Sequence, residues 1–169
     1  MVRSIHAAIV AAFTLFASGP AAAALVLGAQ APPFVLPNAA GNEVTLRSFA
    51  GRPLVLNVFA SWCPPCLIEL PRIAAAARAN GDRVAFVGVD EQEPMTMALA
   101  FIREAKIPYQ VVFDRGQFQA SYGAVSLPET VFVDARGRVA AVVHGAISAA
   151  ELARDLAKIE RPRATPART

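Results

Sequence analysis

The sequence predicts an α/β domain in which helices cover both faces of a mixed central sheet. Two apolar runs of strand length, 53–60 and 83–90, flank a helical segment at 64–80, which is the order of a parallel strand–helix–strand crossover. Two later strands, 130–134 and 138–144, are joined by a tight turn and therefore pair antiparallel. A crossover followed by a hairpin indicates a mixed sheet between two outer layers.

The first and last elements complete this arrangement. A hairpin is predicted near the start, with strands at 34–36 and 43–46 on either side of Asn38 to Asn42. The last helix begins at Ser148-Ala149-Ala150-Glu151, a capping box, and has one apolar face. Between the crossover and the late hairpin, three shorter elements are expected: a helix at 94–106, a strand at 109–113 and a helical piece at 117–122.

Length and composition point to one globular domain. The chain has 169 residues, of which 55% are hydrophobic and 17% charged, so it is neither disordered nor a nucleic-acid binder by composition. Its formal net charge is +3. Arg3 and three tail arginines account for four of the 16 basic residues, so residues 25–160 hold 12 basic and 13 acidic side chains, a net charge of −1.

The N-terminus is typical of an export signal. Arg3 is the only charge before Glu43, and an apolar stretch from Ile5 to Ala17 is followed by Ser18-Gly19-Pro20 and then by four alanines. We expect residues 1–24 to be a signal peptide cleaved near Ala23, or an uncleaved membrane anchor. Either alternative places the domain at 25–160 outside the cytosol, in the periplasm. Residues 161–169 are expected to form a basic disordered tail.

Cys63-Pro64-Pro65-Cys66 contains the only two cysteines and lies where a strand pattern changes to a helix pattern. At a helix N-terminus, unpaired N–H groups and the helix dipole favour the thiolate form of Cys63. Cys66 lies one turn further on, close enough to close a disulfide. Pro64 and Pro65 suit the first helical turn and stiffen it. We therefore expect Cys63 to be the exposed nucleophile and Cys66 the resolving thiol of a redox-active disulfide that needs no other cofactor.

Other uses of two cysteines are less consistent with the sequence. A structural disulfide in so short a loop restrains little chain entropy. A zinc site needs two more ligands, and His144 is the only histidine after the predicted leader. A copper-binding module with two sulfurs and His144 stays open as an alternative, and no metal site is predicted.

Several motifs together resemble a known superfamily. They are Trp62 before the CPPC turn, Pro71 five residues after Cys66, and Leu127-Pro128-Glu129-Thr130 before a strand. These resemble the thioredoxin superfamily. The export signal, Ala60-Ser61-Trp62-Cys63 and Tyr122-Gly123-Ala124-Val125 are more narrowly similar to the TlpA-like and cytochrome-c-maturation thiol-disulfide reductases. The resemblance covers about residues 30–160 and implies a thioredoxin-like three-layer fold with an N-terminal hairpin and a central αβ insert at 91–122.

The resemblance also implies roles for single residues. Pro128 corresponds to a cis-proline opposite the dithiol, where Leu127 exposes its backbone to a substrate strand. Glu69 corresponds to a half-buried carboxyl group with a raised pKa, able to exchange a proton with a cysteine; the alternative is a surface glutamate. Trp62 corresponds to a lid beside Cys63, with core packing as the alternative. Pro64 and Pro65 are expected to contact the substrate.

The expected activity is that of an exported thiol-disulfide oxidoreductase acting mainly as a reductant. In an oxidising compartment such a dithiol must be recharged, and the resemblance implies a membrane electron donor that exchanges thiols. Protein disulfides are the expected substrates, with apocytochrome c as one client, and no nucleic acid is involved. The alternatives are a disulfide oxidase or isomerase of the same fold, or a non-enzymatic module that binds copper or another metal.

Overall fold

The computed structural model describes residues 25–124 and 126–160. Its centre is a five-stranded sheet with the order β5-β4-β3-β6-β7. The three strands β3, β4 and β5 run parallel, whereas β6 pairs antiparallel with β3 and β7 with β6, which confirms the mixed sheet. The strands are β3 (Leu54–Phe59), β4 (Ala85–Glu91), β5 (Gln110–Asp114), β6 (Glu129–Val133) and β7 (Val139–His144).

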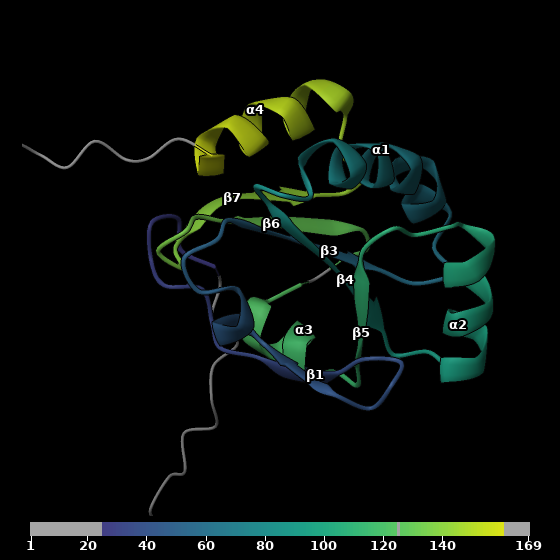
Figure 1. Cartoon of the computed structure of the whole chain (residues 1–169). Coiled ribbons are helices and arrows are strands. Elements are labelled where there is room, and N and C mark those ends of the chain that lie inside the picture. Colours follow the sequence, from purple (N-terminus) through teal and green to yellow (C-terminus); the bar gives the residue numbers. More distant parts are fainter. Residues whose placement is uncertain (1–24, 125, 161–169) are drawn as a thin grey trace, which may run out of the picture.

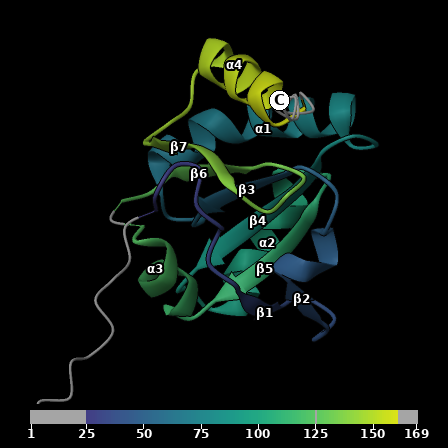
Figure 2. The ribbon, with the colours of Figure 1, turned by 90° about the vertical axis from the view of Figure 1, so that its left-hand side faces the viewer.

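Two apolar layers pack against this sheet. Helices α1 (Pro64–Asn80) and α4 (Ala149–Glu160) lie on one face, and α3 (Gln117–Tyr122) lies on the other together with the hairpin of β1 (Val35–Pro37) and β2 (Glu43–Thr45) (Figures 1 and 2). Helix α2 (Met95–Glu104) lies beside the sheet at the end where α1 begins (Figure 1). The three-layer thioredoxin-like fold is therefore confirmed, with a hairpin as part of the second outer layer.

Strand burial follows from this layering. Every residue of β3 and β4 is buried, as expected for strands covered on both faces. Leu54, Leu56 and Val58 belong to the core beneath the hairpin and α3, whereas Val55 belongs to the core beneath α1 and α4. The apolar run of the sequence thus supplies both cores from alternate residues of one strand.

Most strand boundaries and those of α2 differ by one or two residues from the predicted ones, and two of these differences have a clear local cause. Strand β2 ends at Thr45, because Thr45 and Ser48 form a capping box that starts the short 3₁₀ helix η1 (Leu46–Phe49). Strand β1 begins one residue later than predicted, and the side chain of Phe34 packs against Phe118 and Tyr122 of α3 instead. Local side-chain bonding and packing decide both boundaries.

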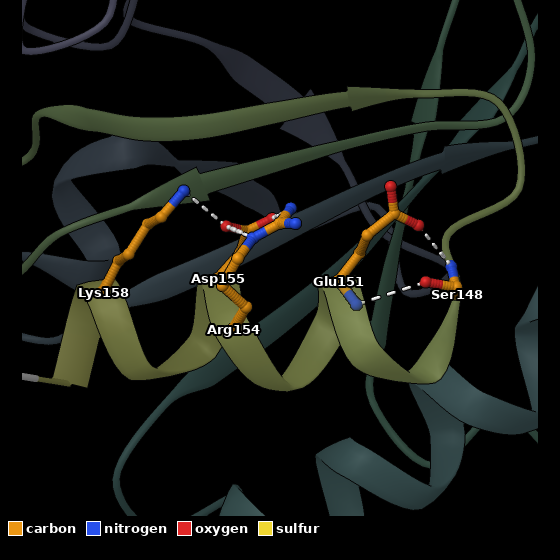
Figure 3. A network of polar contacts seen from close by, with 5 residues as sticks. All are labelled: Ser148, Glu151, Arg154, Asp155 and Lys158. Carbon is orange, nitrogen blue, oxygen red and sulfur yellow. Dashed lines mark hydrogen bonds and ion pairs between the residues drawn. The ribbon is translucent and has the colours of Figure 1, made fainter.

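Helix α4 begins as the sequence predicts. The Glu151 N–H donates to the Ser148 hydroxyl at 3.2 Å, and the Ser148 N–H donates to the Glu151 carboxylate at 2.9 Å (Figure 3). One turn later the buried Asp155 accepts from Arg154 at 2.8 Å and from Lys158 at 2.6 Å (Figure 3). Leu152, Leu156 and Ile159 are buried against the sheet. Both sets of bonds stabilise α4, which packs with α1 over the same buried cluster.

The segment before the hairpin lies at the far end of the sheet from the dithiol. Its Gly28 and Ala31 N–H groups donate to the carbonyls of Val139 and Gly137, at 2.7 and 2.8 Å. Leu27 and Pro53, the residue before β3, line one surface groove there. The other end of β3 leads to Cys63. Between residues 25 and 160, position 125 excepted, no helix is long and apolar enough to cross a membrane. The predicted leader (1–24) and tail (161–169) lie outside the described residues.

Candidate active site

The two cysteines lie at the junction of β3 and α1. The Cys63 N–H closes a turn on the Ala60 carbonyl at 3.2 Å, and Cys63 is the N-cap of α1. Cys63 and Cys66 form a disulfide, with an S–S distance of 2.06 Å and a Cα–Cα distance of 5.3 Å. The pairing predicted from the spacing is therefore present in the structure.

Fewer backbone donors face Cys63 than the sequence analysis expected. Pro64 and Pro65 occupy the first two helical positions and have no N–H. The Leu67 N–H donates to the Cys63 carbonyl at 3.3 Å. Within the described residues the Cys66 N–H is the one backbone group that donates to the Cys63 sulfur, at 3.3 Å. A thiolate at Cys63 would thus rely on this donor and on the dipole of α1.

The two sulfurs differ in access. Cys66 is fully buried, and Cys63 keeps only 3% exposure in the disulfide form, so the expectation of an exposed Cys63 is wrong for this state. Cys63 nevertheless borders a groove of about 440 Å³, whereas Cys66 does not. The other groove residues are Trp62, Pro64, Pro65, Glu91, Gln92, Gln119, Ser126 and Leu127. Trp62 is 60% exposed, which excludes core packing as its role.

The loop before β6 forms the opposite wall of the groove. The Leu127–Pro128 peptide bond is cis, as the resemblance implied. Leu127 lines the groove and packs against the buried cluster of Phe59, Ala60 and both cysteines. Within the described residues its N–H and carbonyl bond to no other backbone group. The backbone at Leu127 is thus placed to pair with an extended peptide beside Cys63.

Glu69 lies in the interior, not half-buried as expected and not at the surface. Its carboxyl group accepts from Asn57 Nδ2 at 2.6 Å and from the Ile147 N–H at 2.8 Å. Burial raises the pKa of Glu69, while the bonds to Ile147 and Asn57 and the charge of Arg72 act in the opposite direction. Glu69 is one helical turn from Cys66, and both residues belong to the buried face of α1.

A pair of acidic residues, not predicted from the sequence, lies next to the dithiol turn. Glu93 accepts the Ser61 N–H at 2.7 Å and also bonds to the Ser61 hydroxyl. Asp90 is buried at the end of β4. Burial, followed by the neighbouring Glu93 carboxyl group and the charge of Glu91, raises the pKa of Asp90 to about 8. The available signal was Asp90, a carboxyl group at the end of the strand-like run 83–90.

A second buried acid follows the cis-proline. Glu129 contacts His144 Nδ1 at 2.8 Å through Oε2. Burial raises the pKa of Glu129, and the charge and bond of His144 oppose this. His144 therefore serves as the partner of a buried carboxyl group, which favours a structural role for it over copper ligation beside the two sulfurs.

Comparison with known proteins gives concordant matches. The AhpC/TSA family matches residues 27–142. A thiol-disulfide oxidoreductase ResA of Bacillus thuringiensis subsp. konkukian is 27% identical over 135 residues, covering 79% of this chain and 78% of the relative. A DsbE-type thiol:disulfide interchange protein from Chlorobium tepidum has a TM-score of 0.73 and 27% identity, covering 82% of this chain and 100% of that structure. A secreted disulfide oxidoreductase of Mycobacterium tuberculosis has a TM-score of 0.67 and 28% identity, covering 73% and 94%.

Proposed function

Because this chain belongs to the AhpC/TSA family and is a thiol-disulfide oxidoreductase of the ResA and DsbE type, we propose that it reduces disulfides of exported proteins. The observation that carries the proposal is the Cys63–Cys66 disulfide at the wall of a groove, with Leu127 on the other side. The proposed reducing direction is supported by the resemblance to exported thiol-disulfide reductases, and in an oxidising compartment such a reductant must be resupplied with electrons.

The reaction is two successive thiol-disulfide exchanges. The Cys63 thiolate attacks one sulfur of the substrate disulfide, a Cys63–substrate bond forms, and the second substrate sulfur leaves and takes up a proton. The Cys66 thiol then loses its proton and attacks the Cys63 sulfur, so the first substrate sulfur leaves. The substrate gains two electrons and two protons, and the enzyme is left with its Cys63–Cys66 disulfide.

Glu69 is the proposed proton acceptor for Cys66. It is one helical turn away and buried, and its raised pKa makes it a better proton acceptor than an ordinary carboxylate. The bonds from Asn57 and Ile147 hold both of its oxygens in place. Glu69 would then act in the resolving step and leave the first attack by Cys63 unchanged.

The groove is the proposed substrate site. A client strand would pair with the Leu127 backbone beside Pro128, while Pro64 and Pro65 form the wall next to Cys63. Trp62, which is mostly exposed, would cover the client segment that carries the disulfide. This arrangement admits an extended polypeptide more readily than a folded surface.

The proposed place of action is the periplasm. The leader-like residues 1–24 support export to the periplasm, either as a soluble protein or attached to the inner membrane, and one solved relative is described as secreted. Turnover would require a membrane protein that returns electrons by thiol exchange. The resemblance to cytochrome-c-maturation reductases makes the disulfide of apocytochrome c a candidate client.

A trapping experiment tests this proposal. In Cys66→Ala the second exchange cannot occur, so exported clients should stay covalently attached to Cys63 and be released by dithiothreitol. Cys63→Ala is the matched control and should capture no client. Capture by Cys63→Ala instead of Cys66→Ala would reverse the two roles, and capture by neither would contradict the reductase assignment.

A further inference from the structure

The backbone just before Cys63 is hydrogen-bonded to a side chain from the loop that follows β4. Glu93 follows β4 and accepts the Ser61 N–H at 2.7 Å through Oε1, and its Oε2 bonds to the Ser61 hydroxyl. Ser61 is the second residue of the Ala60–Cys63 turn, which the Cys63 N–H closes at 3.2 Å. The turn that precedes Cys63 is thus held in place by a side chain that lies 32 residues further along the sequence than Ser61.

Glu93 lies near a buried acid. Asp90 is buried and lies opposite Phe59 of β3 in the strand register, and its Oδ2 has no hydrogen-bond partner among the described residues. Burial, together with the neighbouring Glu93 and Glu91, raises the pKa of Asp90 to about 8, so Asp90 is mostly neutral at pH 7. Both oxygens of Glu93 accept from Ser61.

We propose that Glu93 is a positioning residue for the dithiol: it fixes the Ala60–Cys63 turn so that Cys63 stays within reach of Cys66. Its two bonds go to Ser61 and not to a reacting sulfur. Its effect is on the effective concentration of one thiol at the other, which governs how readily the disulfide closes. This inference rests on the exchange reaction of Cys63 and Cys66.

Equilibration with glutathione measures that effective concentration directly. In the full-length chain at pH 7, Glu93→Ala removes both acceptors of Ser61 and should lower the effective concentration roughly three- to tenfold, where tenfold corresponds to about 30 mV. Glu93→Gln keeps an oxygen for the Ser61 N–H and should stay within about twofold of wild type. Ser61→Ala keeps the backbone bond and should shift the equilibrium by about twofold in the direction of Glu93→Ala.

The matched control is Glu104→Ala, which removes a carboxyl group from an exposed position of α2. It should leave the equilibrium unchanged. Equal values for Glu93→Ala and wild type would overturn the inference, as would an equal shift in Glu93→Gln, because charge and not bonding would then explain it. If Glu93→Ala does not fold, an unshifted Ser61→Ala overturns it. A wild-type protein that fails to equilibrate with glutathione contradicts the proposed function instead.

Discussion

Asn57 of β3 donates a hydrogen bond of 2.6 Å to Glu69 of α1, in the interior one helical turn from Cys66. This bond joins the strand that leads to the dithiol with the helix that begins at it. Asn57 Nδ2 also lies 3.3 Å from the Thr130 hydroxyl of β6. A single amide therefore links the buried carboxyl group to the strand that follows the cis-proline.

Removing Asn57 should destabilise the protein. Asn57→Ala leaves Glu69 Oε1 buried without its donor, which costs about 1–3 kcal/mol. Loss of a bond that lowers the pKa of Glu69 should also raise that pKa further. Urea unfolding at pH 7 measures the first effect. Asn42→Ala, at an exposed position, should change the free energy of unfolding by less than about 0.5 kcal/mol; equal effects of the two variants would contradict the prediction.

Replacing Glu69 should slow the resolving step. Glu69→Gln keeps the shape of the side chain but cannot accept the Cys66 proton, so release of the mixed disulfide should slow roughly tenfold or more at pH 7. Single-turnover mixing with a disulfide peptide separates this step from the first attack, which should keep its rate. The exposed Glu104→Gln is the control. An unchanged release rate would show that Glu69 does not take part in the resolving step.

Asp90 should make stability fall as the pH rises. Its pKa is raised from 3.8 to about 8 in the folded protein, so its contribution is complete below about pH 4 and is lost as the pH approaches 8. Glu93 and Glu91 are the charged groups that act on it. Asp90→Asn is neutral throughout. Relative to this variant, disulfide-form wild type should lose about 2 kcal/mol of unfolding free energy between pH 5 and pH 9, a value reduced from 1.4 kcal/mol per pKa unit by relaxation.

Chemical denaturation of both proteins across this pH range gives the measurement. Asp82→Asn, at an exposed position, is the control and should follow the wild-type curve. A constant difference between wild type and Asp90→Asn would show that Asp90 has the same protonation in the folded and unfolded states. The disulfide must stay closed throughout, so that the cysteines do not titrate.

Trp62 should contribute to client binding and have little effect on stability. Because its side chain is 60% exposed, Trp62→Ala should change the free energy of unfolding by less than about 0.5 kcal/mol. The KM for a protein disulfide should rise several-fold, while the equilibrium with glutathione stays the same. Phe59→Ala, at a fully buried position, is the contrasting variant and should cost about 3–5 kcal/mol. A large loss of stability in Trp62→Ala would instead indicate that the Trp62 side chain packs in the core.

Elements with a strong local signal could be predicted from the sequence. The apolar runs at 53–60 and 83–90 gave the two fully buried strands, and the CPPC turn gave the disulfide, because period and spacing are local properties. The cis bond before Pro128 followed from the resemblance. The single donor at Cys63 was also within reach, since proline has no N–H wherever it stands.

The buried carboxyl groups could not be predicted in the same way. The local sequence around Glu69 is equally consistent with a surface position on a helix. Its two hydrogen-bond partners, Asn57 and Ile147, lie 12 and 78 residues away in the sequence. The bond between Glu93 and Ser61 likewise joins two loops that only the parallel pairing of β3 and β4 brings together. Such partners are set by tertiary packing, which carries no local pattern.

The segment around Gly28 lies where β3 begins, and β3 extends over six residues toward Cys63, about 20 Å further along. Any tether that continues from residue 25 toward the N-terminus would therefore attach the molecule at the end of the sheet opposite the dithiol. The sulfur pair would then face outward from the attachment surface. Unfolded clients in the surrounding compartment would then reach it without a reorientation of the molecule.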